Sequence, residues 1–152
     1  MDVHALIDER AISRIYMRYC DIVDSKDFDR LDEVFTPDTH HDYTQSMPGV
    51  VTDNLAMIVG AMTLNLGAGS LCGATHHNVT NFRIEVTGDS ATAKVHYIAA
   101  HAGTRRMAGH VYTMWGEYDD RFVRTPAGWR VRDRIYTTAL TQGEIVTLAD
   151  RA

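Results

Sequence analysis

Apolar and polar positions follow two different periods in the two halves of the chain. Over residues 5–23, apolar side chains recur every three or four residues, which predicts one long amphipathic helix. Its inward positions are Leu6, Ile7, Ile12, Ile15, Tyr16, Tyr19, Cys20 and Val23. The first part of the chain therefore begins with a helix that has one apolar face.

Two shorter helices are predicted to follow. The segment "SKDFDRLDEVF" (25–35) predicts a short helix that buries Phe28, Leu31, Val34 and Phe35. It ends at "TPD", because Pro37 disfavours a helical conformation at Thr36. The segment "TDNLAMIVGAMTLNL" (52–66) predicts a third helix capped by Thr52 or Asp53, and "HHDYTQS" (40–46) predicts a short strand between the two helices.

The second half of the chain has the pattern of long strands. Four strands are predicted over residues 75–86, 90–103, 110–124 and 129–140. The stretches "TGDS" and "TPAGW" indicate turns, "RRMAG" indicates a loop, and a short helix is expected from about Glu144. Helices followed by a run of antiparallel strands indicate the α+β class, and residues 1–152 are expected to form a single domain.

Composition and charge exclude several classes of function. The chain has 152 residues, of which 45% are hydrophobic, and a formal net charge of −5. It contains no Lys/Arg run that would indicate nucleic-acid binding, and no apolar run near the ~20 residues that cross a bilayer. The N-terminus does not resemble a secretory signal, and Cys20 and Cys72 are too few for a disulfide framework. We therefore expect a cytoplasmic protein that binds neither nucleic acid nor membrane.

The histidines are the first candidates for chemistry. In the strand 90–103, His101 ends the apolar row Ala91, Ala93, Val95, Tyr97 and Ala99, whereas His96 lies on the opposite face. A polar side chain in such a row is either hydrogen-bonded within the core or part of a site. His101 is thus predicted to point inward and His96 to face solvent.

The pair His76 and His77 cannot be oriented from the period alone. Neighbouring residues of a strand point to opposite faces, so the two rings are not expected to chelate one ion, and no zinc or iron spacing is present. We therefore expect no metal site. The apolar row Phe82, Ile84 and Val86 extends to His76, whereas a bulge in the strand would turn His77 inward instead.

In the last strand, alternation predicts which side chains enter the core. Trp129, Val131 and Ile135 are predicted to face inward, and Arg130, Arg132 and Arg134 to face outward. Asp133 falls on the inward row, where we expect an ion pair at the rim.

Together these elements resemble the nuclear transport factor 2-like superfamily, and within it the SnoaL-like proteins and scytalone dehydratase. The resemblance rests on the order of the elements and on the motifs "DSKDFDRL", "HDY", "THHNVTNFRIE", "AAHAGTRR", "GHVYTMWGEY" and "GWRV". It covers nearly the whole chain. It implies a cone-shaped α+β fold, in which three N-terminal helices pack on a curved, mostly antiparallel sheet around a deep apolar pocket.

The resemblance also implies the catalytic residues. Its motifs place the active-site aspartate at Asp24, a catalytic tyrosine at Tyr43, the catalytic base at His77 and the second histidine at His101. We assign His77 as base with Asp24 as its partner, Tyr43 to polarise a carbonyl group, and His101 as acid or proton shuttle. The other carboxylates between residues 19 and 35 are expected to be solvated.

The chain departs from the family pattern at the positions that bind substrate. Val23 occupies the place of the second catalytic tyrosine, and Tyr19, five residues before Asp24, is the candidate replacement. Thr113 and Trp115 lie near the positions of the family's substrate-binding serine and asparagine. Tyr19, Val23, Thr113 and Trp115 are therefore predicted to contact a substrate other than scytalone.

The predicted function is a lyase that needs no cofactor and removes water from a hydroxylated cyclic ketone. Isomerisation, cyclisation or dehydrohalogenation in the same pocket is the alternative chemistry, and a non-catalytic module that binds a small ligand is the alternative class. The expected partners are a small apolar cyclic substrate and further copies of the chain. The resemblance implies a homo-oligomer, either a dimer or a trimer, formed through the exposed face of the sheet.

Overall fold

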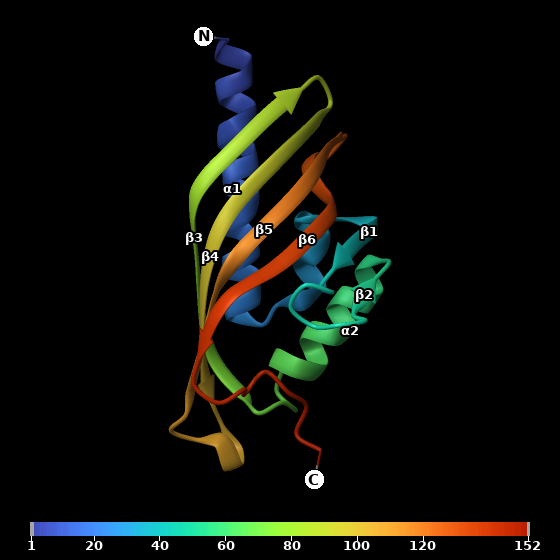
Figure 1. The fold of residues 1–152 in the computed structure, drawn as a ribbon. Helices are drawn as coiled ribbons and strands as arrows, with labels where there is room; N and C mark the ends of the chain where they lie inside the picture. The colour runs from blue at the N-terminus through green and yellow to red at the C-terminus, as the bar shows by residue number, and fades with distance from the viewer. Residues whose placement is uncertain (1, 152) are drawn as a thin grey trace.

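A curved six-stranded sheet carries the helices on one side (Figure 1). The computed structural model describes residues 2–151. The helices are α1 (Val3–Ser25), α2 (Leu55–Leu66) and the 3-10 helices η1 (Phe28–Glu33) and η2 (Arg105–Met107). The strands are β1 (Phe35–Asp42), β2 (Val51–Thr52), β3 (Cys72–Thr87), β4 (Ser90–Gly103), β5 (Val111–Thr125) and β6 (Gly128–Gln142). Their order is β2-β1-β6-β5-β4-β3, and β1 and β6 form the parallel pair of an otherwise antiparallel sheet. The predicted α+β fold is confirmed.

Helix α1 begins beyond the end of the sheet and then packs against it (Figure 1). Asp2 caps its N-terminus by accepting a hydrogen bond from the backbone N–H of His4. Leu6 and Ile7 are exposed, contrary to the prediction, because the first turns project past the strands. From Ile12 onward the predicted apolar face is buried.

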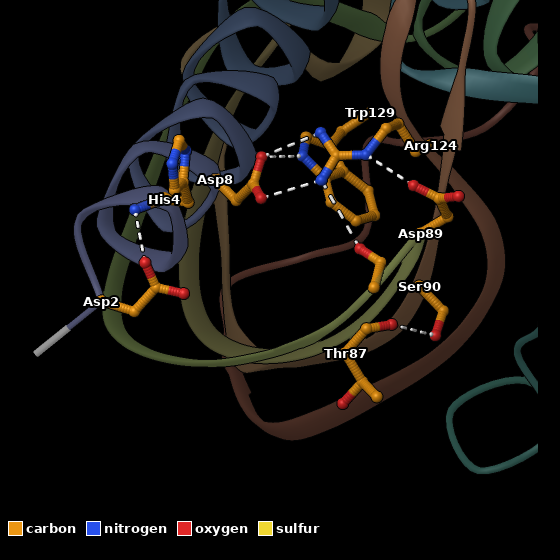
Figure 2. Close-up of polar contacts among 9 residues, drawn as sticks. Asp2, His4, Asp8, Thr87, Asp89, Ser90, Arg124 and Trp129 are labelled. Atoms are coloured by element: carbon orange, nitrogen blue, oxygen red, sulfur yellow. Dashed lines mark hydrogen bonds and ion pairs between the residues drawn. The ribbon is translucent and has the colours of Figure 1, made fainter.

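The N-terminal part of α1 is tied to the sheet by one guanidinium group (Figure 2). Arg124 of β5 donates to both carboxylate oxygens of Asp8 at 2.9 and 2.8 Å, and also to Asp89 in the β3–β4 turn. The indole N–H of Trp129 in β6 donates to Asp8 at 3.0 Å, and the guanidinium lies 4.3 Å from the indole centroid. The contacts of Asp8 therefore hold the helix over two strands.

The short elements differ from the predictions in their ends. Strand β1 begins at Phe35, earlier than predicted, and runs through Pro37. Helix α2 is capped by Asn54, whose side chain accepts from the backbone N–H of Met57, rather than by Thr52 or Asp53. The segment from Glu144 forms no helix; Leu148 instead pairs with the chain just before β3 through its carbonyl oxygen.

Two β-bulges reverse the alternation of side chains within single strands. In β3, Thr80 pairs with His96 but Arg83 with Lys94, so β3 has one extra residue, and Asn81 takes a φ of 55°. In β6, the register shift at Arg132 turns Arg134 inward and leaves Ile135 40% exposed. The predicted directions of Arg134 and Ile135 were therefore wrong. The prediction assumed strict alternation along the strand, and the inserted residue reverses that alternation.

The inward turn of Arg134 creates a buried ion pair in the core. Its guanidinium donates to both oxygens of Asp120 at 2.8 Å, and the two side chains are 2% and 0% exposed. The hydroxyl of Tyr16 donates to the same carboxylate at 2.7 Å. The rings of Tyr118 and Tyr19 lie 4.0 and 4.8 Å from the guanidinium carbon. These contacts join α1, β5 and β6 at the centre of the molecule.

Replacing Arg134 with Met is expected to destabilise the protein by about 3–5 kcal/mol, because it leaves the Asp120 carboxylate buried and unpaired. Urea unfolding monitored by circular dichroism measures the loss. Arg132→Met, at the neighbouring side chain that is 48% exposed, should change stability by no more than about 0.5 kcal/mol. Equal losses in the two variants would show that the buried ion pair stabilises the fold no more than the exposed Arg132 side chain does.

Candidate active site

One carboxylate of the acidic segment points inward, at the C-terminal end of α1. Asp24 accepts three contacts from β3: the imidazole Nδ1 of His77 at 2.7 Å, the backbone N–H of His77 at 2.9 Å and the hydroxyl of Thr75 at 2.8 Å. The side chain of His77 is 7% exposed and that of Asp24 24%. The predicted pairing of Asp24 with His77 is therefore present in the structure.

The hydrogen bonds of this pair fix its charge and its tautomer. Burial acts to raise the pKa of Asp24, but the hydrogen bonds from His77 and Thr75 outweigh it and lower that pKa below its usual value. An ionised carboxylate can only accept, so Nδ1 of His77 carries a proton. In the neutral form of the ring this leaves the lone pair on Nε2, which is the arrangement a general base requires.

The bulge in β3 determines which histidine enters the site. On the His77 side of the bulge at Asn81, the inward row is Thr75, His77 and Val79, and His76 is exposed. Without the extra residue, the apolar row beyond the bulge would continue to His76. The orientation that the sequence left open is thus settled by a local break in the ladder.

His101 lies beside His77 on the neighbouring strand. It is 3% exposed, its residue pairs with Thr75 in the ladder, and its ring centroid is 5.7 Å from that of His77 at an interplanar angle of 87°. Its Nδ1 lies 3.0 Å from the carbonyl oxygen of Tyr112, which can only accept, so Nδ1 is protonated and Nε2 is free to accept. Burial, opposed by this hydrogen bond, lowers the pKa of His101 to about 4.

Tyr19 and Val23 both precede Asp24 on α1, but they lie in different surroundings. The ring of Tyr19 meets the His77 ring edge-on, with 6.3 Å between their centroids. Val23 is fully buried within the hydrophobic core. Tyr19 is therefore the phenol adjacent to the pair.

The phenol of Tyr43 is engaged in a directional chain of hydrogen bonds. Thr39 donates to the carbonyl oxygen of Arg132 at 3.1 Å, which leaves its oxygen to accept from Nε2 of His41 at 3.0 Å. Nδ1 of His41 is then the acceptor for the Tyr43 hydroxyl at 3.2 Å. Burial, reinforced by Arg134, lowers the pKa of His41 to about 2, which keeps this ring neutral. The proton of Tyr43 is consequently directed at His41.

The structure does not place Thr113 and Trp115 beside His77 and His101. Trp115 pairs with Ile98, which is exposed on the outer face of the sheet, and Thr113 shares that outer row of β5. The inward residues of β5 at this level are Tyr112 and Met114. Thr113 and Trp115 therefore lie on the face of the sheet opposite to the one that carries His77 and His101.

Sequence reasoning missed two residues of the site. Thr75 was identifiable in principle, since it lies two residues before His77 and so shares its face. Lys26 gave no signal, because it follows the helix in an acidic segment. Its ammonium nevertheless donates to the Thr75 hydroxyl at 3.1 Å, one step from Asp24.

Between residues 2 and 151, no three His, Cys, Asp or Glu side chains are grouped as metal ligands. In the same part of the chain, no helix combines the length and the apolar character needed to span a bilayer.

Comparisons with known proteins identify relatives of this chain. The model of the SnoaL-like domain family matches residues 4–135. The Mycobacterium tuberculosis protein Rv2910c is 30% identical over 145 residues, which are 90% of this chain and 89% of Rv2910c. The Kfla4162 protein of Kribbella flavida superposes with a TM-score of 0.82 at 26% identity, over 90% of this chain and 93% of its own. A Novosphingobium aromaticivorans protein named as a candidate scytalone dehydratase gives 0.80 at 22% identity, over 97% and 96% of the two chains.

The lowered pKa of His101 predicts a pH dependence of stability. The unfolded chain binds a proton at this residue near pH 6.5, whereas the folded protein does so only at about 4. The unfolded state is therefore favoured as the pH falls through this window, by about 1.4 kcal/mol per pH unit. In His101→Asn, the free energy of unfolding between pH 6 and pH 4.5 should fall less steeply than in the wild type.

Chemical denaturation at a series of pH values measures this slope. His96→Asn, the same change on the exposed face of the same strand, is the matched control. A slope that is unchanged by His101→Asn would mean that His101 is protonated as readily in the folded protein as in the unfolded chain.

Proposed function

Because this chain belongs to the SnoaL-like family, within the nuclear transport factor 2-like superfamily, we propose that it is a hydro-lyase that removes water from a hydroxylated cyclic ketone without a cofactor. The single observation that carries this proposal is the hydrogen bond of 2.7 Å between His77 Nδ1 and Asp24, with the His101 ring beside it. A neutral histidine held by a carboxylate is a general base.

The first step is abstraction of a proton from the carbon next to the substrate carbonyl. The C–H bond breaks, its proton goes to Nε2 of His77, and its electron pair forms the enolate. Asp24 stabilises the imidazolium that results, because its carboxylate already accepts the hydrogen bond from Nδ1. The three contacts to Asp24 also hold the ring in one orientation throughout the step.

In the second step the enolate expels the hydroxyl group from the adjacent carbon. A lone pair of the enolate oxygen re-forms the carbonyl, the electron pair of the enolate C=C bond forms the new double bond to the carbon that carries the hydroxyl, and the C–O bond breaks with its electron pair going to hydroxide. The departing hydroxide takes the proton from His77 and leaves as water, which restores the neutral imidazole. One histidine can thus act as base and then as acid on the same face of the substrate.

The hydrogen-bond directions assign different duties to the two other candidates. Neutral His101 offers only an acceptor at Nε2, so in this proposal it orients the substrate hydroxyl or relays a proton that it first receives. Tyr43 directs its proton at His41, so polarising a carbonyl would cost it that hydrogen bond. We therefore assign Tyr43 a positioning role in the wall of the site.

The expected substrate is apolar and cyclic. In this proposal its apolar surroundings come from Val59, Met62 and Leu66 of α2 and from Met114 and Tyr136, which are partly buried hydrophobic side chains packed against the core. Sites for small ligands are lined mainly by apolar side chains with a few polar groups, a lining that suits a flat apolar ring. A non-catalytic binding module would not need two buried histidines whose Nδ1 atoms are held by fixed acceptors.

His77→Ala and Asp24→Asn are each expected to lower turnover by about 10²–10⁴-fold, because the first removes the base and the second the partner that stabilises its charged form. A screen of hydroxylated cyclic ketones by mass spectrometry, scored by loss of one water, identifies the substrate for this assay. His76→Ala and Asp21→Asn are matched controls, since each alters an exposed neighbour on the same element, and both should retain wild-type activity.

Two results would count against the proposal. Wild-type turnover in His77→Ala or in Asp24→Asn would remove the pair from the mechanism. If the protein exchanged the proton next to the carbonyl for deuterium from solvent while releasing no water, the same pair would instead support isomerisation.

A further inference from the structure

A lysine lies beside the His77–Asp24 pair without a carboxylate of its own. Nζ of Lys26 donates to the hydroxyl of Thr75 at 3.1 Å, and that hydroxyl donates in turn to Asp24 at 2.8 Å. Lys26 is half-buried, yet no carboxylate among residues 2–151 lies within 4.0 Å of its ammonium. One of its three N–H groups is therefore accounted for by Thr75, and its charge has no direct counterion.

Burial of this ammonium has an electrostatic cost that its neighbours do not remove. Loss of contact with water is the main influence on the Lys26 side chain, and it lowers its pKa, against the attraction of Cys72 and Asp24. The two oxygens of Asp24 are already engaged by Thr75 and His77. An incoming anion would supply the missing counterion.

The backbone at Lys26 has a conformation that is uncommon for a lysine. The residue follows the last turn of α1 with a φ of 63°, and its N–H closes the helix on the carbonyl groups of Ile22 and Val23. Glycine takes this left-handed conformation at the end of a helix without strain, whereas a lysine is uncommon there. From this position at the end of α1, the Lys26 side chain reaches Thr75 of β3, beside the His77–Asp24 pair.

The proposed reaction lacks a group that binds the enolate oxygen. Tyr43 directs its proton at His41, and the Nδ1 proton of His101 is held by the Tyr112 carbonyl. Lys26 is connected to Asp24 through the hydroxyl of Thr75, which lies on the same side of β3 as His77, and its other N–H groups are uncommitted. Donors placed where charge develops are a major source of rate acceleration in such reactions.

We propose that Lys26 is the oxyanion-binding residue of this site, and that it holds the substrate oxygen that becomes the enolate. This assignment rests on proton abstraction by His77 as set out above. Before the step, the charges of Lys26 and Asp24 balance; after it, the imidazolium faces Asp24 and the enolate faces Lys26. The transferred proton therefore creates two ion pairs and no unpaired charge.

Binding of 4-nitrophenol tests the oxyanion site without knowledge of the substrate. Its phenolate and phenol forms absorb at different wavelengths, so a spectrum reports which form is bound, and 4-nitroanisole serves as the neutral probe of similar shape. We expect the wild type to bind the phenolate, and Lys26→Met to bind it about 10- to 100-fold more weakly, while 4-nitroanisole binds equally to both.

Two further variants separate the charge of Lys26 from its place in the fold. Lys26→Gly suits the left-handed backbone, so its urea midpoint should not fall, yet it should lose phenolate binding as Lys26→Met does. Lys94→Met is the control: Lys94 is the only other lysine, is half-exposed on the outer face and pairs with Asp119 at 3.1 Å. Phenolate binding in Lys94→Met should equal that of the wild type.

The outcomes distinguish this assignment from the lyase proposal. Wild-type affinity for the phenolate in Lys26→Gly and Lys26→Met would overturn the oxyanion role, whatever His77→Ala does to turnover. Retained turnover in His77→Ala would overturn the lyase proposal, whatever Lys26 binds. On the substrate, Lys26→Met should lower kcat; a raised KM with unchanged kcat would show that Lys26 binds a permanent anionic group, and would overturn the enolate assignment.

Discussion

The Asp24 carboxylate is the contact on which the rest of the site depends. A half-buried carboxylate remains ionised only if hydrogen bonds replace the water it has lost, and Asp24 obtains these from Thr75 and from the ring and backbone of His77. Because the donors all belong to β3 and the acceptor to α1, the same contacts dock the end of the helix on the strand. The orientation of the His77 ring and the packing of the helix are thus set together.

The buried carboxylate of Asp120 and the half-buried carboxylate of Asp24 differ in function because their partners differ. Asp120 faces the guanidinium of Arg134, a permanent cation, so the two buried charges compensate each other. Asp24 faces an imidazole, which can gain a charge and lose it again. The Arg134 pair therefore organises the core, while the charge of Asp24 remains available to stabilise an imidazolium.

The sequence was sufficient where strands are regular and insufficient where they are not. The inward row of β4, which ends at His101, follows strict alternation and was predicted correctly. The directions of His77 and Arg134 depend on bulges at Asn81 and Arg132. The alternation of apolar and polar residues does not show where a strand contains an inserted residue. Lys26 could not be found either, because its role arises from a left-handed turn and a contact between segments distant in the chain.

The directions of the hydrogen bonds limit the chemistry more closely than the fold does. Proteins of one fold run many reactions, so the SnoaL-like fold alone leaves the reaction open. In this chain both imidazoles give their Nδ1 proton to a fixed acceptor, Asp24 for His77 and the Tyr112 carbonyl for His101. Each ring is left with an accepting Nε2, and the ammonium of Lys26 is the nearby cation. A site with two acceptors and one cation is suited to reactions that begin with removal of a proton and leave an oxyanion behind, rather than to reactions that begin with protonation of the substrate.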